Sequence, residues 1–363
     1  MQQAWIERID AYDETRLEQI FCAHRAFLCA GLVPGDTVLV KPNLLQEAQP
    51  ERALTTDPRF VRVFVHFLLD QGYRIIIGDI PGNHIPAERL AAALGLVDDA
   101  GDARLTICSL DQHGFTPAPL KQPLSPRPVT LPSLLWQCKA IFNLPKAKTH
   151  ALTLITGAVK NLFGLTPKAE RAGLHMIASA DGFARCLLDL HAALPVPERI
   201  VMDGILGMEG DGPSAGHARQ LNAVIISDDP VLTDRTMCRL MGVGWEKTPL
   251  SRVVPQPDET LVHGDLTPVD PPFALPRTYV SGGAAAVSIT AGFQRIIGAS
   301  NRPIPVVSRS RCVRCGVCAQ RCPAGAIALA PWPTFDRKKC VLCYCCHEMC
   351  PRQAVTLRYR LHR

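Results

Sequence analysis

The sequence predicts an α/β fold, in which helices cover both faces of a mostly parallel sheet, followed by a small cysteine-rich α+β module. Over the first 300 residues, short apolar runs that suit strands alternate with segments that suit helices. This alternation is typical of a parallel sheet. Beyond it, nine of the fifteen cysteines fall between Cys312 and Cys350. A length of 363 residues accommodates two such domains, which we expect at residues 1–300 and 301–363.

The expected elements of the large domain are bounded by turn and cap residues. Strands are expected at residues 37–40, 73–77, 105–108, 139–144, 199–202 and 223–226, and helices at residues 60–71, 86–94, 153–163, 181–194 and 231–241. Thr55 to Pro58 provide cap candidates followed by proline, and Gly72 provides a natural helix end. Polar residues and glycines gather after the strands, at the edge where open α/β sheets bind ligands.

Composition points to a folded protein. Apolar residues make up 47% of the chain and charged residues 20%, which excludes a disordered chain. The first residues contain no apolar segment of the kind that a secretory signal needs. No run reaches the roughly 18 apolar residues of a membrane helix. We therefore expect a cytoplasmic protein without a membrane span, in a reducing compartment that keeps thiols available for metal.

The cysteine-rich module contains an internal repeat. Residues 312–329 match residues 340–357 at an offset of 28, with eight identities, four of them cysteine. Each half carries the pattern C-x2-C-x2-C-x3-C-P. The repeat therefore indicates a duplicated half-module.

This cysteine spacing predicts two [4Fe–4S] clusters. Three cysteines on a tight loop bind one cluster, and the fourth cysteine of each run points away and binds the other cluster. The expected ligands are Cys312, Cys315, Cys318 and Cys350 for one cluster, and Cys340, Cys343, Cys346 and Cys322 for the other. At these residues the module resembles bacterial-type two-cluster ferredoxins.

Two alternatives concern the cysteines. Zinc is the alternative metal, but zinc sites pair two C-x2-C knuckles and need four ligands, which fits eight cysteines in duplicate poorly. Cys345 is an additional thiol between Cys343 and Cys346. Its use as a ligand would break the spacing that the two halves share, so we expect it to lie beside a cluster without binding iron.

The positive charge of the chain is concentrated in the module. Residues 302–363 contain twelve Lys or Arg and two Asp or Glu, whereas the whole chain has a net charge of +6. Arginines beside the ligands would offset the negative charge of thiolate-bound clusters. The same charge suits docking of an acidic redox partner protein, or is a solvated basic face. Nucleic acid is not expected, since no aromatic residues interleave the arginines and no DNA-binding motif occurs.

The large domain has a candidate anion site after its strands. The expected anion-binding residues are Lys146, Lys148, His150 and Lys160, with Lys41, Asn43, Asp203, Glu209 and Asp211 as further ligand-binding candidates. Lysines and a histidine at one sheet edge suit a small anionic substrate such as a carboxylate or phosphate. The acidic glycine-rich loop from Asp203 to Asp211 suits a divalent cation, or backbone amides that hold a ligand. Pairing of these acids with the lysines is the structural alternative.

These segments also resemble the family catalogued as domain of unknown function 362. The matching motifs are VKPN at Val40–Asn43, PKAKTH at Pro145–His150, KNLFG at Lys160–Gly164 and the glycine-rich loop at Asp203–Pro213. The resemblance spans nearly the whole chain, and members often end in a two-cluster ferredoxin module. It implies an iron–sulfur protein but no particular reaction.

Other motifs are set aside. Ser214 lies in a G-x-S-x-G match, but a nucleophile elbow needs a strand before it and a helix after it, and a glycine loop precedes this one. No G-x-G-x-x-G or Walker A motif occurs, so neither NAD nor ATP is predicted.

The expected function is that of an iron–sulfur oxidoreductase, which passes single electrons to or from an anionic substrate or cofactor in the α/β domain. The residues leave two other functions open. One is an electron carrier or docking subunit without a substrate of its own. The other is a non-redox enzyme that uses a metal ion on a carboxylate, with clusters that sense redox state or stabilise the fold.

Overall fold

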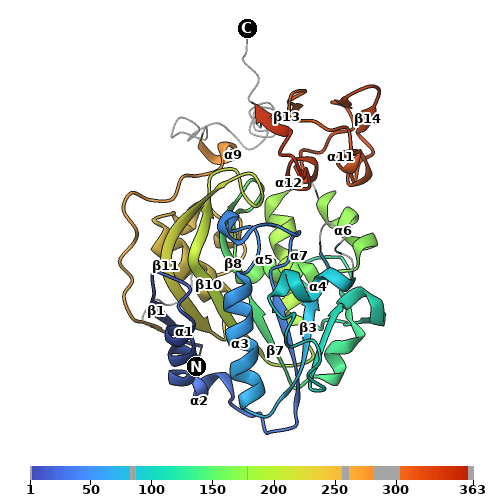
Figure 1. Ribbon diagram of the computed structural model, residues 1–363. Helices are drawn as coiled ribbons and strands as arrows, with labels where there is room; N and C mark the ends of the chain where they lie inside the picture. Colours follow the sequence, from blue (N-terminus) through green and yellow to red (C-terminus); the bar gives the residue numbers. More distant parts are fainter. Residues whose placement is uncertain are drawn as a thin grey trace.

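The computed structural model describes residues 2–81, 85, 87–177, 179–255, 261–280 and 303–358. A large α/β domain occupies most of this range, and the small module sits above one end of it (Figure 1). The predicted boundary near residue 300 lies outside the described residues. No helix of the described ranges has the length and apolar character to cross a membrane.

The main sheet is mixed, with a parallel half and an antiparallel half. Its order is β12-β1-β11-β10-β7-β2-β3-β4, with β8 and β9 attached beside β10. The strands are β1 (Ala4–Arg8), β2 (Thr37–Pro42), β3 (Arg74–Asp79), β4 (Leu105–Ser109), β7 (Ala140–Leu144), β8 (Lys146–His150), β9 (Leu154–Thr156), β10 (Glu198–Glu209), β11 (His217–Ser227) and β12 (Val262–His263). Neighbours from β10 to β4 are parallel, whereas β11 is antiparallel to both β1 and β10. A separate short hairpin pairs β5 (Phe115–Pro117) with β6 (Thr130–Pro132).

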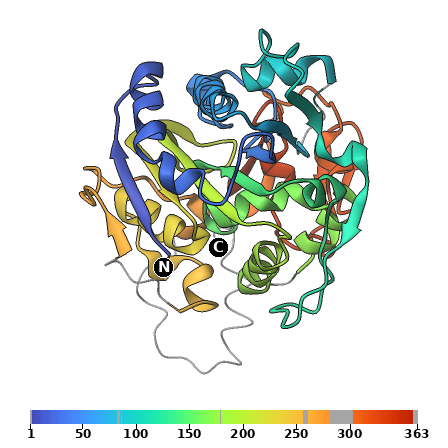
Figure 2. The ribbon, with the colours of Figure 1, turned by 90° about the horizontal axis from the view of Figure 1, so that it is seen from below.

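Helices cover both faces of this sheet, as the sequence predicts, and Figure 2 shows them on opposite sides of the strands. They are α1 (Glu14–Ala23), α2 (Arg25–Leu28), α3 (Pro58–Asp70), α4 (Ala87–Leu94), α5 (Ala158–Asn161), α6 (Lys168–His175), α7 (Ala180–Ala192), α8 (Pro230–Met241) and α9 (Arg277–Val280). The expected cap of α3 is confirmed, because the Asp57 side chain accepts the Arg59 amide and Pro58 opens the helix.

One predicted helix is wrong in its first half. Residues 153–163 do not form one continuous helix, because β9 turns back and pairs with β8 in an antiparallel hairpin. Leu154 takes a φ of 68°, which a helix interior excludes. The helix begins only at Ala158, where Asp234 of α8 accepts the amides of Ala158 and Val159. A distant side chain thus sets this boundary.

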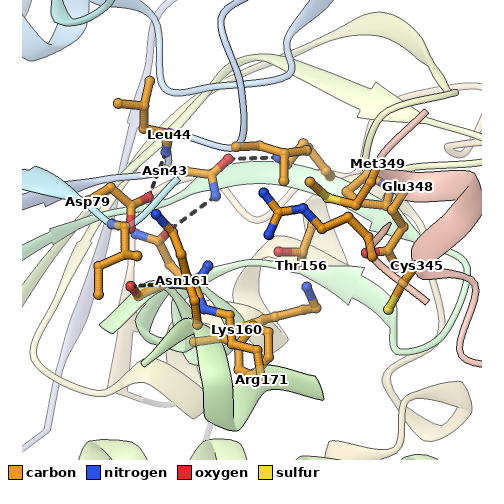
Figure 3. A pocket seen from close by; sticks show the side chains of 18 of the residues that line it. Asn43, Leu44, Asp79, Thr156, Lys160, Asn161, Arg171, Cys345, Glu348 and Met349 are labelled. Atoms are coloured by element: carbon orange, nitrogen blue, oxygen red, sulfur yellow. Dashed lines mark hydrogen bonds between the residues drawn. The ribbon is translucent and has the colours of Figure 1, made fainter. Parts of the chain in front are cut away.

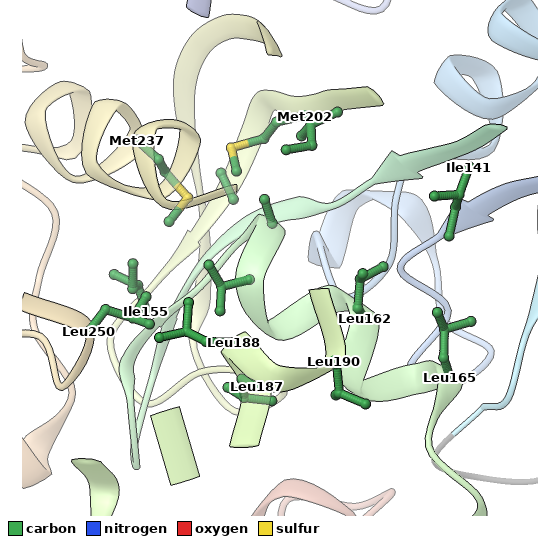
Figure 4. Packing of buried hydrophobic residues seen from close by; sticks show 14 of the residues in the cluster. Ile141, Ile155, Leu162, Leu165, Leu187, Leu188, Leu190, Met202, Met237 and Leu250 are labelled. Carbon is green, nitrogen blue, oxygen red and sulfur yellow. The ribbon is translucent and has the colours of Figure 1, made fainter. Parts of the chain in front are cut away.

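Two apolar cores lie on opposite faces of the sheet. Val38 and Val40 of β2 belong to one core, and Leu39 between them belongs to the other. Successive side chains of a strand point to opposite faces, so a strand buried on both sides is apolar throughout. Figure 4 shows the core that holds Ile141 and Met202 of the sheet, with Leu187 and Leu190 of α7. Both cores fix the strand ends from which the site is built.

The two halves of the module have the same backbone. Its elements are β13 (Ile304–Val307), α11 (Val317–Gln320), β14 (Ile327–Leu329), β15 (Pro333–Phe335), α12 (Cys345–Glu348) and β16 (Val355–Arg358). Positive φ angles recur at the repeat offset: 56° at Arg314 and 55° at Leu342, then 79° at Gly316 and 64° at Tyr344. The helices α11 and α12 begin at equivalent positions. The repeat in the sequence is therefore a repeat in three dimensions.

The second half of the module packs on the α/β domain. Ser214 Oγ donates to the Glu348 carbonyl oxygen at 2.6 Å, and Gln353 Nε2 donates to the Ser214 carbonyl oxygen at 3.0 Å. Leu342 and Tyr344 pack against Ala151, which follows β8. Figure 1 shows α12 on the side of the module that faces the α/β domain. Ser214, which the sequence places in a loop, thus joins the two domains.

Candidate functional site

The eight cysteines of the repeat surround two separate cavities in the module. One cavity is lined by Cys312, Cys315, Cys318 and Cys350, which we call the outer set, and the other by Cys322, Cys340, Cys343 and Cys346, which we call the inner set. In each set, three cysteines come from one run and the fourth comes from the other run. This is the crossed arrangement that the spacing predicts.

The chemistry of each set fits an iron–sulfur cluster better than zinc. Cys322 Sγ accepts the Ala326 amide at 3.2 Å, and Cys350 Sγ accepts the Ala354 amide at 3.2 Å. Such bonds favour a thiolate. In the described residues, no three His, Cys, Asp or Glu side chains are grouped to hold a single metal ion. The four sulfurs of each set line a small cavity, which is how the ligands of a four-iron core are arranged.

A pocket of about 230 Å³ lies between the α/β domain and the module. Its α/β wall comes from the carboxyl ends of parallel strands, with Asn43 after β2, Asp79 ending β3 and Lys148 in β8. Its other wall comes from the module, with Arg321, Cys322, Cys345, Glu348 and Met349. Figure 3 shows Lys160, Asn161 and Arg171 on one side of this pocket and Cys345, Glu348 and Met349 on the other. Lys168, Gln320, Thr156 and several apolar side chains complete the lining.

Lys148 brings positive charge into the interior at this pocket. Its side chain is 1% exposed, and Nζ donates to Asn43 Oδ1 and to the Leu54 carbonyl oxygen, both at 2.7 Å. Among the described residues, no carboxylate lies within ion-pairing distance of it. Burial lowers the pKa of Lys148 well below its ordinary value, and the charges of Lys160 and Lys146 lower it further. A bound anion would oppose this lowering and favour the ammonium form, whose third donor is then free for the ligand.

Three further cations extend from Lys148 across the pocket. Burial lowers the pKa of Lys160, and the charge of Arg171 lowers it further, against the opposing effect of Glu348 and Cys345. Burial likewise lowers the pKa of Arg171, with a further contribution from Arg321 of the module. Lys160 and Arg171 both lie over the Phe163 ring, at 5.7 Å from its centre. Arg171 also donates to the carbonyl oxygens of Thr166 and Gly164, which fixes its position.

The carboxylates of the pocket already have cationic or polar partners. Asp79 Oδ1 lies 2.9 Å from Lys41 Nζ, and its other oxygen accepts the Leu44 amide. Glu348 Oε1 lies 3.1 Å from His150 Nε2. His150 Nδ1 accepts the amides of Leu152 and Thr153, which fixes the ring with Nε2 toward Glu348. The pocket therefore has an excess of positive charge, which a bound anion would compensate.

A chain of amide side chains holds the pocket wall in place. Asn43 Nδ2 donates to Asn161, Asn161 donates to Asn143, and Asn143 donates to Glu198. Glu198 in turn lies 2.7 Å from His191 of α7. The hydrogen bond from Asn43 Nδ2 to Asn161 thus orients the Asn43 amide so that its Oδ1 faces Lys148.

The structure separates the predicted residues into those at the pocket and those elsewhere. Lys148, Lys160 and Asn43 line the pocket, and His150 adjoins it through Glu348. Lys146 instead lies deeper, where Nζ donates to Asp203 Oδ2 and to the Tyr12 hydroxyl, both at 2.6 Å. Lys41 is the buried partner of Asp79 below the pocket. The expected convergence of all four anion-binding residues therefore does not occur.

Glu209 and Asp211 of the acidic loop do not face the lysines either. Glu209 pairs with Arg219 at 2.8 Å, and Asp211 pairs with Arg277 at 3.0 Å. Neither lines the pocket, because β10 continues to Glu209, and the loop reaches the pocket at Pro213 instead. The structural alternative of internal pairing applies to Lys146 and Asp203. No grouping for a divalent cation is found in this loop or among the other described residues.

Sequence reasoning missed Asp79, Arg171, Arg321 and Glu348 as pocket residues. Asp79 ends a predicted strand, so its position in the sequence could have indicated a site residue. Arg171 sits on the short helix α6, where a basic residue ordinarily indicates a solvated face. Arg321 and Glu348 lie among the cysteine ligands, and nothing in their spacing indicates that they face another domain.

Fold and cysteine arrangement together define an α/β protein with a ferredoxin-type iron–sulfur module, the class of protein that transfers electrons. A 4Fe–4S binding domain matches residues 305–328, which hold the first cysteine run. The family model of the domain of unknown function DUF362 matches residues 38–239, more than half of the chain. The chain therefore belongs to the DUF362 family, as the motifs predict.

One curated protein and two solved structures are similar to parts of the chain. A thylakoid-associated protein of Synechocystis is 31% identical over 207 residues, which are 55% of this chain and 61% of that protein. The chain thus spans about three-fifths of that relative's length. A solved protein of Thermotoga maritima has a TM-score of 0.41 and 13% identity, covering 59% of this chain and 56% of its own. Apo-lactate racemase of Thermoanaerobacterium thermosaccharolyticum has a TM-score of 0.40 and 10% identity, covering 65% and 56%.

The two buried lysines are expected to differ in their effect on stability. Lys146→Met should lower the free energy of unfolding by about 3–5 kcal/mol, because Asp203 would remain buried without its cation. Lys148→Met should change it by about 1 kcal/mol or less, since loss of an uncompensated charge offsets the loss of two hydrogen bonds. Urea denaturation of both variants measures the difference, and equal losses would contradict it.

Proposed function

We propose that the protein binds two [4Fe–4S] clusters and moves single electrons between them and a small organic anion held in the pocket between the domains. One observation carries this proposal. Cys322 belongs to the inner set and also lines the pocket. An anion there would lie against a ligand of the inner cluster, close enough for direct electron transfer.

The outer and inner sets supply the ligands, four thiolates each. A [4Fe–4S] cluster supplies reversible one-electron chemistry when bound. The chain contributes the amide donors to Cys322 and Cys350, which disperse the charge on those sulfurs. Arginines beside the ligands, such as Arg321 and Arg352, offset the negative charge that remains.

The pocket residues favour an anion with more than one charge and a carbon body. Lys148, Lys160, Arg171 and Arg321 form a row: beside the effect of burial, Lys160 lowers the pKa of Lys148, Arg171 lowers that of Lys160, and Arg321 lowers that of Arg171. A single anionic group would compensate one or two of them. Leu44, Ile80 and Met349 line the pocket as well, and they suit an apolar skeleton. A small di- or tricarboxylate, or a phosphorylated acid, has this chemistry.

The same residues favour electron transfer to such a ligand. An electron added to the ligand adds negative charge, and the row of cations stabilises that charge in a partly water-excluded site. Glu348 and Met349 close the pocket from the module side, so the two domains must stay docked for the site to form. The protein is thus proposed as an oxidoreductase and not as an electron carrier alone.

The two other functions find less support. A docking subunit without a substrate has no use for Lys148, whose buried charge lacks a carboxylate partner among the described residues. A metal-assisted enzyme needs oxygen or nitrogen ligands gathered for one ion, and the acids of the glycine-rich loop are occupied by Arg219 and Arg277.

Cluster content tests the first half of the proposal. Protein purified without oxygen should contain about eight irons and eight sulfides per chain. Cys346→Ser should lose or convert one cluster, whereas Cys345→Ser should keep both, because Cys345 lies outside both cysteine cavities. Iron analysis and electron paramagnetic resonance measure this. Four irons or fewer in the wild type, or stoichiometric zinc, would contradict the assignment.

Anion binding tests the second half. Citrate and inorganic phosphate are suitable probes, and at least one should raise the midpoint of thermal unfolding in proportion to RT ln(1 + [L]/Kd). Lys160→Met should abolish this rise, since Lys160 faces the pocket without a hydrogen-bonded partner among the described residues. Lys247→Met is the matched control, an exposed lysine outside the pocket, and should keep it. A rise of equal size in both variants would exclude the pocket as the binding site.

A further inference from the structure

The two cysteine sets differ in their surroundings. Leu342 and Tyr344 of the inner loop pack against Ala151 of the α/β domain, and Cys322 lines the pocket. Both cysteine cavities are lined by residues of the module, but none of the outer cysteines lines the pocket. Of the eight cysteines, Cys315 of the outer set is the exposed one, whereas the other seven are buried or half-buried. The inner set thus reaches the pocket through Cys322, and the outer set has the more exposed cysteine, Cys315.

The segment around the outer set is strongly basic. Arg309, Arg311 and Arg314 are exposed on residues 309–316, which we call the outer loop, and Arg352 is exposed beside Cys350. Arg314 and Arg352 line the outer cavity itself. Residues 303–335 contain no Asp or Glu. In the described part of the chain, no carboxylate lies within ion-pairing distance of these four arginines.

The outer loop also presents apolar surface. Val313 is 57% exposed, between Cys312 and Arg314. Arg314 lies over the Trp332 ring, with its guanidinium 5.2 Å from the ring centre. A small apolar centre within a ring of charge is the composition of a transient protein interface.

From these observations we infer that the outer loop is the docking surface for a small acidic electron-carrier protein. Electrons then cross the module from this loop to the pocket, first through the outer set and then through the inner set. The inference rests on the two clusters of the proposed function but not on the ligand of the pocket. At each encounter the reduced partner loses one electron and the protein gains one, with no bond made or broken. Acidic carriers fit because their carboxylates would compensate Arg309, Arg311, Arg314 and Arg352.

The position of the docking surface can be tested by making the same charge reversal at two different places on the module. Arg309→Glu with Arg311→Glu reverses two charges on the outer loop. Lys338→Glu with Lys339→Glu reverses two exposed charges beside Cys340 of the inner set. Both double variants change the net charge equally, so a general electrostatic effect would slow both alike.

The measurement is the second-order rate of reduction by a reduced acidic two-cluster ferredoxin, followed by loss of visible absorbance in a stopped-flow instrument. At low ionic strength the outer-loop variant should be slower than the wild type by about tenfold or more, and the inner variant by about twofold or less. Salt should slow the wild type and reduce the difference between the variants. Equal slowing in both variants, or a larger loss in the inner variant, would overturn the inference.

Two controls separate this outcome from loss of the clusters. Iron content and the total absorbance change with excess dithionite should match the wild type in every variant. If the outer double variant loses iron, the single variant Arg309→Glu replaces it, because this residue is not adjacent to a cysteine. Intact clusters with an unchanged rate would reject the docking surface alone, whereas a wild type without about eight irons would reject the proposed function.

Discussion

Lys148, Lys160 and Arg171 place positive charge in the wall between two domains, and the carboxylates near them are occupied by other partners. Asp79 is paired with Lys41, and Glu348 lies against His150. Burying an uncompensated charge is costly, so a fold retains such a group where a ligand will compensate it. The row of cations therefore connects three other features. It lines the pocket, it faces the docked helix α12, and it lies beside the inner cysteine set.

The docked module completes the pocket and also connects it to the surface. Arg321 and Cys322 come from the end of the first cysteine run, and Cys345, Glu348 and Met349 come from the second. The two runs have the same backbone, with α11 and α12 at equivalent positions. Both runs contribute residues to the wall of the pocket. The outer loop, by contrast, is turned to solvent with its arginines. A duplicated ferredoxin module thus acquires an inner and an outer side from its contact with the α/β domain.

The cysteine sets could be predicted from the sequence, because the ligands of a cubane lie at short, fixed spacings on one loop. The parallel half of the sheet could also be predicted, since each strand is an apolar run that ends in polar residues. The partners of the lysines could not. Lys146 and Lys148 occupy alternate positions of one strand, yet one meets Asp203 and the other meets Asn43. Which lysine has a carboxylate partner depends on strand register, and no local pattern specifies the register of β8 against β10.

The residues that sequence reasoning missed lie far along the chain from those they meet. Glu348 contacts His150, and Arg171 lies in the same pocket as Arg321. Helix α5 begins where Asp234 of another helix accepts its first amides, which no local propensity indicates. Conversely, Glu209 and Asp211 were expected at the site from their glycine-rich loop, but the length of β10 carries them to Arg219 and Arg277.

We propose that the pocket of the α/β domain and the iron–sulfur module form one electron-transfer site. A redox titration monitored by electron paramagnetic resonance, comparing the wild type with Arg171→Gln, tests it most directly. Arginine keeps its charge at any working pH, and positive charge near a cluster favours the reduced form. We expect the midpoint potential of one cluster to fall in the variant, while that of the other stays unchanged. Unchanged potentials for both clusters, in a variant that retains its iron, would contradict the claim.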